Sequence, residues 1–296
     1  MNNRVHVASC PVCSEEKFSP FIKVEDHMIS KETFDLVSCD NCGFVFTNPI
    51  PSLDCLGDYY KSDEYVSHSS TSKGIINWLY HKVREKTLNQ KKQLIDKLSK
   101  NKKVLDVGAG TGHFVRKLKD NGYSVIGIEP DADARKLALE LNEVYLLKQE
   151  HLYELDAASI DVVTMWHVLE HIPNLNEDLE RMSAILGTNG YMVVAVPNRA
   201  SFDALHYKEY WAAYDVPRHL YHFRKTDLIC LMEKHQLQLV DVIPMKFDAF
   251  YVSMLSEKYK KGSLLKALWI GFISNMKAKK ADGYSSQIYI FRKKTK

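Results

Sequence analysis

The chain has 296 residues, of which 45% are hydrophobic and 26% are charged, with 13 glycines and 9 prolines. This balance is typical of a globular protein and excludes a disordered, collagen-like or small disulfide-stapled chain. Forty basic and 37 acidic side chains give a net charge of +3, which argues neither for nor against binding to nucleic acid. A chain of this length can bury a large core in one domain or in two unequal ones.

The distribution of apolar residues fits neither a secreted protein nor a membrane-spanning one. Residues 1–8 are polar and lack the apolar run of a signal peptide. The longest apolar stretch, 264–273, is interrupted by Lys266 and is shorter than the roughly 20 residues that cross a bilayer. Six cysteines are also few for a secreted disulfide framework. We therefore expect a cytoplasmic protein.

Four of the six cysteines form two C-x-x-C pairs with 25 residues between them. Two such pairs supply four thiolates, which suit a tetrahedral Zn²⁺ ion. A site with four protein ligands has no open position for water, so we expect a structural metal without chemistry of its own. The pattern predicts a small zinc ribbon over residues 1–50, with these ligands: Cys10, Cys13, Cys39 and Cys42.

Residues 51–100 form a tyrosine-rich linker followed by a helix. Apolar residues recur at helical spacing from Ile75 to Leu98, which predicts one long helix. Tyr65 lies in the polar part of this segment. Its ring could stack on or hydrogen-bond a substrate, or it could pack between the two folded parts, and the sequence leaves both readings open.

From residue 101 onward, short apolar runs alternate with helical patterns. Continuous apolar strands that alternate with helices indicate an α/β fold whose parallel sheet is covered on both faces. We expect helices at 112–121, 132–141 and 176–185. We expect a seven-stranded, Rossmann-like sheet with an antiparallel last strand, built from 103–107, 123–128, 144–147, 160–166, 190–196, 237–243 and 287–291.

A glycine-rich loop follows the first of these strands. Gly108, Gly110 and Gly112 let the backbone turn sharply and approach a ligand closely. The next helix presents free N–H groups and the positive end of its dipole there. Glu129 follows Gly110 by nineteen residues, at the end of the second strand. An acid in that place typically accepts hydrogen bonds from ribose hydroxyls.

The spacing of the loop separates two kinds of nucleotide cofactor. Dinucleotide-binding proteins carry G-x-G-x-x-G, whereas this loop reads G-x-G-x-G and follows an aspartate, Asp106. The motif resembles that of class I S-adenosylmethionine-dependent methyltransferases, and the resemblance covers residues 101–245. It implies S-adenosyl-L-methionine as methyl donor. It also implies that Glu129 holds the ribose, that the glycine loop cradles the cofactor and that Asp106 supports its methionine end.

The end of the fourth strand agrees with this family. The segment 161–173 resembles the corresponding motif of small-molecule methyltransferases, including the ubiquinone-type O-methyltransferases. The resemblance implies that Trp166 and His167 line the cofactor and substrate cleft. Gln149 is the candidate for the adenine edge, where the family commonly has an aspartate. The N-terminal cysteines together with Asn48-Pro49 resemble zinc-containing bacterial methyltransferases, some of which C-methylate nucleotide-linked keto-sugars.

The segment 214–223 is the densest polar cluster of the chain and follows the fifth strand, where class I methyltransferases insert substrate-binding elements. Asp215 and Arg218 are candidate substrate ligands. Methyl transfer needs alignment of the nucleophile and removal of one proton, which suits an imidazole. Our order of candidates for the general base is His219, His222 and then His167. The alternative is a structural network that holds a lid.

The last segment carries a helical insertion at about 246–285. Tyr251 near its start is a further candidate for substrate contact. Residues 257–296 contain 11 basic and two acidic side chains. This basic region could meet an anionic substrate or a membrane surface, but we favour a solvated face and an insertion helix that packs on its own domain.

These features predict a zinc ribbon at 1–50, a linker and helix at 51–100, and a class I methyltransferase domain at 101–296. The expected function is methyl transfer from S-adenosylmethionine to a small-molecule acceptor by C- or O-methylation, such as a sugar or another biosynthetic intermediate. One alternative is a nucleic-acid or protein methyltransferase with the ribbon as reader. It is not favoured, because the Asn/Asp-Pro-Pro-Tyr/Phe motif of base-methylating enzymes is missing after the fourth strand. The second alternative is a scaffold that binds the cofactor without catalysing a reaction.

Overall fold

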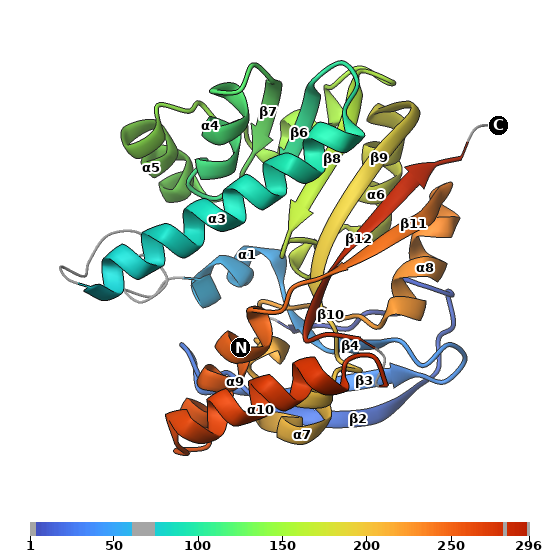
Figure 1. Ribbon diagram of the computed structural model, residues 1–296. Coiled ribbons are helices and arrows are strands. Elements are labelled where there is room, and N and C mark those ends of the chain that lie inside the picture. The colour runs from blue at the N-terminus through green and yellow to red at the C-terminus, as the bar shows by residue number, and fades with distance from the viewer. Residues whose placement is uncertain (1–3, 61–74, 281–282, 295–296) are drawn as a thin grey trace.

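A computed structural model describes residues 4–60, 75–280 and 283–294 of the chain (Figure 1). Its central sheet has six strands in the order β11-β12-β9-β8-β6-β7. Strands β6, β7, β8 and β9 run parallel, and β12 is antiparallel to both of its neighbours, as the sequence predicts. The strands are β6 (Lys103–Val107), β7 (Ser124–Ile128), β8 (Ile160–Trp166), β9 (Leu186–Pro197), β11 (Leu237–Pro244) and β12 (Ser286–Lys293).

The expectation of seven strands is wrong by one. The segment 144–147 makes only a single parallel bridge, between Ile128 and Leu147, beside the edge strand β7. The bridge uses two hydrogen bonds, from Leu147 N to Gly127 O and from Glu129 N to Leu147 O, both 2.9 Å long. The chain enters from a left-handed residue, Glu143, and turns into a 3₁₀ helix at Gln149. Too few extended residues remain between these turns for a ladder.

Helices cover both faces of the central sheet, and alternate strand residues point to opposite faces. On one face, Ile95 and Phe114 of two helices pack in a cluster with Val104, Val162 and Val193. The other face is covered by helices that bury leucine and methionine side chains. The covering helices are α3 (Ile75–Leu98) and α4 (His113–Lys119) on the first face, α6 (Leu175–Ile185) and α8 (Lys225–Lys234) on the second, and α5 (Ala132–Asn142) beyond α4.

The N-terminal residues build a separate four-stranded sheet in the order β10-β4-β3-β2. Its fourth strand comes from the distant segment after β9, because Tyr221 pairs with Phe46 and His222 pairs with Val45. The small sheet therefore lies directly against the methyltransferase-like part (Figure 1). Its strands are β2 (Phe18–Glu25), β3 (Thr33–Cys39), β4 (Val45–Thr47) and β10 (Tyr221–His222); β1 (Arg4–Val5) pairs with β5 (Ile50–Pro51).

The insertion after β11 is a helical hairpin that packs on the segment after β9. Its helices are α9 (Asp248–Tyr259) and α10 (Leu264–Lys277), and its neighbour is α7 (Phe202–Tyr207). Within the described part of the chain, no helix combines the length and apolar character needed to span a bilayer. The remaining short elements are α1 (Leu53–Leu56), η1 (Gly57–Tyr60), η2 (Gln149–Tyr153), η3 (Leu169–His171), η4 (Lys208–Tyr210) and η5 (Ala212–Tyr214).

Candidate functional site

The glycine loop turns between β6 and α4 with all three glycines in the left-handed region, at φ of 69°, 53° and 77°. Two of them are needed for packing. A Cβ on Gly108 would lie 2.4 Å from Val168 Cγ2, and one on Gly112 would lie 3.2 Å from Ala138 Cβ. A Cβ on Gly110 would meet nothing within 4 Å. Gly110 therefore faces open space at the carboxyl end of β6, where a ligand can approach the backbone.

Glu129 at the end of β7 is held against this loop. Its Oε2 accepts a hydrogen bond of 2.7 Å from Gly110 N, and its Oε1 accepts one of 2.9 Å from Asp131 N. The side chain is buried, and burial raises the pKa of its carboxyl despite the two backbone donors. The structure thus brings together the two features on which the ribose assignment depends, the acid and the loop.

Asp106 in β6 is a buried carboxyl on the same side of the molecule. It accepts a hydrogen bond of 2.6 Å from Thr164 Oγ1 in β8. Burial raises its pKa to about 6, and neither this bond nor the charge of Lys91 outweighs the desolvation. A positively charged ligand near Asp106 would stabilise the ionised form.

Lys91 in α3 is a residue that the sequence reasoning missed. Its Nζ lies 4.2 Å from the ring centroid of Trp166 and 5.7 Å from that of Phe114. Burial lowers its pKa to about 8, against the charges of Asp106 and Asp248. The sequence could have singled out Lys91, because this lysine lies at helical spacing on the apolar side of the helix predicted over residues 75–98. A lysine in that place is costly unless it meets a negative partner.

Trp166 and His167 end β8 beside the glycine loop. The Trp166 Nε1 is buried and has no hydrogen-bond partner among the described residues. His167 has a left-handed backbone and places its imidazole between two acids, with Nε2 3.2 Å from Asp248 Oδ2 and Nδ1 3.5 Å from Glu170 Oε1. Burial alone would lower its pKa, but the two carboxylates outweigh burial and raise it to about 10. His167 therefore carries its proton at neutral pH, which fits its last place among the candidate bases.

Gln149, the candidate for the adenine edge, begins η2 and is half-buried. Its Nε2 donates a 3.0 Å hydrogen bond to Asp178 Oδ2 in α6. Asp178 also accepts a hydrogen bond from Tyr153. The amide is thereby held at the edge of the sheet next to β7, and its adenine role stays a prediction.

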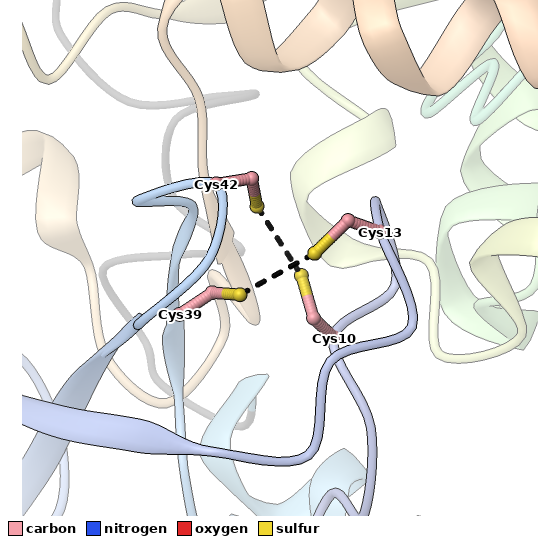
Figure 2. Close-up of side chains that lie close together, drawn as sticks. All are labelled: Cys10, Cys13, Cys39 and Cys42. Carbon is pink, nitrogen blue, oxygen red and sulfur yellow. Dashed lines mark hydrogen bonds between the residues drawn. The ribbon is translucent and has the colours of Figure 1, made fainter.

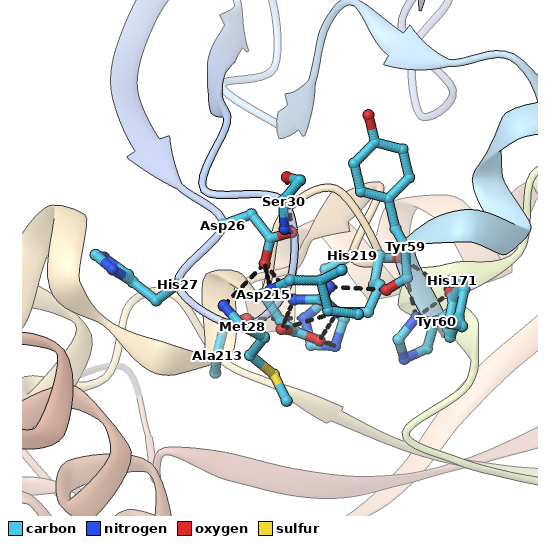
Figure 3. Close-up of polar contacts among 12 residues, drawn as sticks. Asp26, His27, Met28, Ser30, Tyr59, Tyr60, His171, Ala213, Asp215 and His219 are labelled. Atoms are coloured by element: carbon cyan, nitrogen blue, oxygen red, sulfur yellow. Dashed lines mark hydrogen bonds and ion pairs between the residues drawn. The ribbon is translucent and has the colours of Figure 1, made fainter. Parts of the chain in front are cut away.

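Arg218 lies at the centre of a polar network that joins distant segments. Figure 3 labels its partners Asp26, Tyr59 and Asp215. Its guanidinium donates to both oxygens of Asp215, at 2.7–3.1 Å, and to Asp26 Oδ1 at 3.0 Å. Its Nη1 donates to Tyr59 O at 2.9 Å. The side chain is buried, so in this structure it cross-links the chain, and the substrate-binding roles of Arg218 and Asp215 stay predictions.

Two histidines meet beside this network, His171 and His219, with ring centroids 4.5 Å apart and nearly perpendicular planes. His219 Nδ1 lies 2.8 Å from Ala213 O, and His171 Nδ1 lies 2.9 Å from Arg218 O. Because carbonyl oxygens only accept, the neutral form of each ring carries its proton on Nδ1 and its lone pair on Nε2. Burial, with the charge of His219, lowers the pKa of His171 to about 4.

Glu170 completes this group. It is buried, and its Oε1 forms the ion pair of 3.5 Å with His167 Nδ1. One ligand atom from each of Glu170, His171 and His219 lies within 4.8 Å of the others. These two imidazoles and one carboxylate form a donor set that could hold a divalent metal ion. A backbone carbonyl orients each histidine.

Three further candidates remain to be placed. His222 is buried in β10, where its Nε2 lies 3.3 Å from Thr47 Oγ1, and burial first, with the charge of His219, places its pKa well below the usual range. Tyr251 is half exposed on α9. Tyr65 lies outside the described residues. The structure therefore brings His219 and His222 near one another, with His222 buried in a strand of the small N-terminal sheet.

The four predicted metal ligands converge, although their two pairs are far apart in the sequence (Figure 2). Cys10 Sγ lies 3.7 Å from Cys42 Sγ, and Cys13 Sγ lies 3.4 Å from Cys39 Sγ. A tetrahedral ion with Zn–S bonds of about 2.3 Å needs sulfur atoms about 3.8 Å apart. The four thiols are free of disulfides and fit such an ion.

Comparisons with known proteins agree with this geometry. The methyltransferase domain family model matches residues 79–242. The ubiquinone biosynthesis O-methyltransferase of Cronobacter sakazakii is 35% identical over 106 residues, which cover 33% of this chain and 43% of that protein. The enzyme of the same name from Vibrio parahaemolyticus is 32% identical over 127 residues, covering 40% and 53%. The chain thus spans about half the length of these curated relatives.

Solved structures share the fold at low identity. A methyltransferase from Archaeoglobus fulgidus, described as dependent on S-adenosylmethionine, has a TM-score of 0.50 at 19% identity and covers 74% of this chain and 100% of its own. Magnesium protoporphyrin IX methyltransferase from Synechocystis, solved with bound SAH, has a TM-score of 0.53 at 13% identity, with 82% and 100% covered. With its sheet order, glycine loop and strand-end acid, the chain belongs to the methyltransferase domain family of class I S-adenosylmethionine-dependent enzymes.

Proposed function

We propose that the protein transfers a methyl group from S-adenosylmethionine to a small-molecule acceptor, by C- or O-methylation. The observation that carries the proposal is the contact between Glu129 and the open Gly110 at the carboxyl ends of β6 and β7. Ligands of open α/β sheets bind in this crevice, where the strand order reverses. The similarity to ubiquinone biosynthesis O-methyltransferases favours a biosynthetic intermediate, such as a phenol or a sugar, as the acceptor.

Each residue around the loop would bind a different part of the cofactor. Glu129 would accept hydrogen bonds from the ribose, and Gln149 would meet the adenine edge. Lys91 would pair with the carboxylate of the methionine end, while Asp106 would face its positive charge. When bound, S-adenosylmethionine supplies a methyl group that its sulfonium already activates, so the protein has to orient the acceptor and remove a proton.

His219 is the proposed general base. The hydrogen bond to Ala213 O fixes its tautomer and leaves the Nε2 lone pair able to accept a proton from the acceptor. Asp215 Oδ2 lies 3.9 Å from Nε2 and would stabilise the imidazolium that forms. Glu170 and His171 lie beside this histidine and would orient it.

The cysteine cluster would hold a structural zinc ion. The spacing of its sulfur atoms and the burial of Cys10 and Cys39 support this role. Four thiolates need a reducing compartment, which supports the cytoplasm as the place of action. The ion would stabilise the small sheet that shares β10 with the rest of the chain, and we assign it no part in the methyl transfer.

Native mass spectrometry of the full chain, with and without S-adenosylmethionine, tests the proposal. We expect one zinc ion and one cofactor molecule per chain, and in Glu129→Gln a lower occupancy of the cofactor with unchanged zinc. Incubation with labelled methyl donor and pools of phenols and keto-sugars should then give a labelled product. Zinc without cofactor binding would contradict methyl transfer and favour a non-catalytic role.

A further inference from the structure

The helix α10 is apolar on two opposite faces, of which its own domain covers only one. Ala267, Ile270 and Ser274 are buried against α9 and α7. Gly271 permits this contact, because a Cβ there would lie 2.9 Å from Phe250 Cδ1. The sequence expectation that the insertion packs on its own domain thus describes one side of the helix.

The opposite face presents large apolar side chains to solvent. Leu265 is 81% exposed, Trp269 61% and Met276 66%, and Leu268 and Phe272 lie between them at 42% and 49%. Positions 265, 268, 269, 272 and 276 follow helical spacing, so they form one stripe along the helix. Scattered exposed leucines are ordinary, but an uninterrupted stripe of this kind marks an interaction surface. In Figure 1, α10 lies on the outside of the molecule.

The charged side chains of the segment that carries this stripe are all positive. Residues 258–280 contain seven lysines and no acidic residue. All seven lysines are exposed. One of them, Lys266, lies 3.3 Å from the buried Glu257 at the end of α9. An apolar face with tryptophan, phenylalanine and leucine, bordered by lysines, is the pattern of a helix that lies in the interface of an anionic membrane.

We propose that α10 docks the protein on an anionic lipid bilayer, with the Leu265–Trp269–Phe272–Met276 stripe in the headgroup region and the lysines at its edge. A second copy of the chain fits this face less well, because a symmetric contact would bring the two sets of lysines together. The hairpin also carries Asp248, 3.2 Å from His167 Nε2, so docking would present the candidate site to a membrane-held acceptor. The docking itself goes beyond methyl transfer and does not depend on it.

Flotation of the full, zinc-loaded chain with vesicles tests this inference without any acceptor. We expect binding to vesicles of phosphatidylcholine with phosphatidylserine, much weaker binding to phosphatidylcholine alone, and loss of binding at high salt. The variant Trp269→Ser/Phe272→Ser should weaken binding at least about tenfold, because affinity scales with the apolar area that enters the interface. The variant Lys279→Gln/Lys280→Gln should weaken it about fivefold per lysine.

Matched controls use exposed residues elsewhere. Leu139→Ser/Leu141→Ser on α5 removes side chains of similar exposure, and Lys119→Gln/Lys136→Gln removes two exposed charges. Both should float like the unmodified chain. All variants change exposed side chains, and circular dichroism confirms that they fold.

Two results would overturn the inference. One is equal flotation of the α10 variants and their controls. The other is a lipid-free dimer that Trp269→Ser/Phe272→Ser converts into a monomer in analytical ultracentrifugation, without vesicle binding by the unmodified chain. That result would make the stripe an interface between two copies.

Discussion

Arg218 Nη2 lies 3.0 Å from Asp26 Oδ1 and thereby joins two segments that are 192 residues apart in the chain. Both side chains are almost fully buried, and Asp215 completes the group with a second, bidentate contact. The candidate base His219 follows Arg218 directly in the sequence. The position of His219 relative to the small N-terminal sheet is therefore fixed by a buried ion pair, in addition to the β10–β4 pairing.

Removing Arg218 should destabilise the whole protein. Arg218→Leu leaves Asp26 and Asp215 buried without their cation, and the free energy of unfolding should fall by about 3–5 kcal/mol. Arg116→Leu, at exposed pairs with Asp120 and Glu143, should have a much smaller effect and is the matched control. Urea denaturation followed by circular dichroism measures both. Equal effects of the two substitutions would contradict the cross-link.

The same ion pair predicts an acid dependence. Burial acts to raise the pKa of Asp26, but Arg218 and backbone donors outweigh it and hold the pKa below the ordinary value of 3.8. A depressed pKa contributes stability that is present above 3.8 and is lost as the pH falls toward the folded-state pKa. Acid titration of the unmodified chain should show this loss below about pH 4, and Arg218→Leu should flatten it. A parallel acid profile in both proteins would assign the effect to other carboxyls.

Binding of S-adenosylmethionine should move protons in opposite directions at two pH values. Asp106 has a pKa of about 6, so a positive group bound beside it should release protons near pH 6. Lys91 has a pKa of about 8, so a bound carboxylate should cause proton uptake near pH 8. Calorimetry in buffers of different ionisation enthalpy measures both. Lys91→Met should abolish the uptake alone, and its persistence would refute the Lys91 contact.

Replacing the strand-end acid should separate cofactor binding from folding. Glu129→Gln keeps the shape of the side chain but loses the charge that accepts from the ribose. Its dissociation constant for S-adenosylmethionine should rise about 10- to 100-fold, with a melting temperature close to that of the unmodified protein. Glu140→Gln on exposed α5 is the control. Unchanged affinity in Glu129→Gln, measured by calorimetry, would exclude the ribose role.

The cysteine cluster should couple metal content to folding. Cys39→Ser should lose the zinc ion and lower the melting temperature, because the free energy of metal binding is part of the folding free energy. Cys230→Ser changes an exposed cysteine outside the cluster and should keep both. Elemental analysis and thermal unfolding give the readouts. A Cys39→Ser protein that melts like the unmodified chain would show that the cluster does not hold a structural ion.

The proposed base should affect turnover more than binding. His219→Ala should lower kcat by ~10²–10⁴ with little change in cofactor affinity. His235→Gln, at a partly buried histidine that contacts Asn176, is the control. A parallel loss of turnover and cofactor affinity in His219→Ala would assign His219 a structural role.

Local patterns in the sequence determined much of this protein. The turn from strand to helix at Gly108, Gly110 and Gly112 was predicted from the spacing of the glycines. The four candidate metal ligands were likewise predicted from the spacing within each C-x-x-C motif. Helix α3 is predicted with its observed bounds because its apolar positions repeat every 3.6 residues. These features depend on residues close in sequence, which is why they can be read without the fold.

Only the tertiary structure decided which distant groups meet. The pairing of Asp26 with Arg218, the lone pairs of His171 and His219 beside Glu170, and the contact of Asp248 with His167 all join segments whose separation no local pattern encodes. The seventh strand was lost for the same reason, since a ladder needs a partner along its length and 144–147 finds it at one bridge. Tertiary packing also lowered the pKa of Lys91 and left the α10 stripe exposed, because desolvation and exposure depend on what the whole chain places around a group.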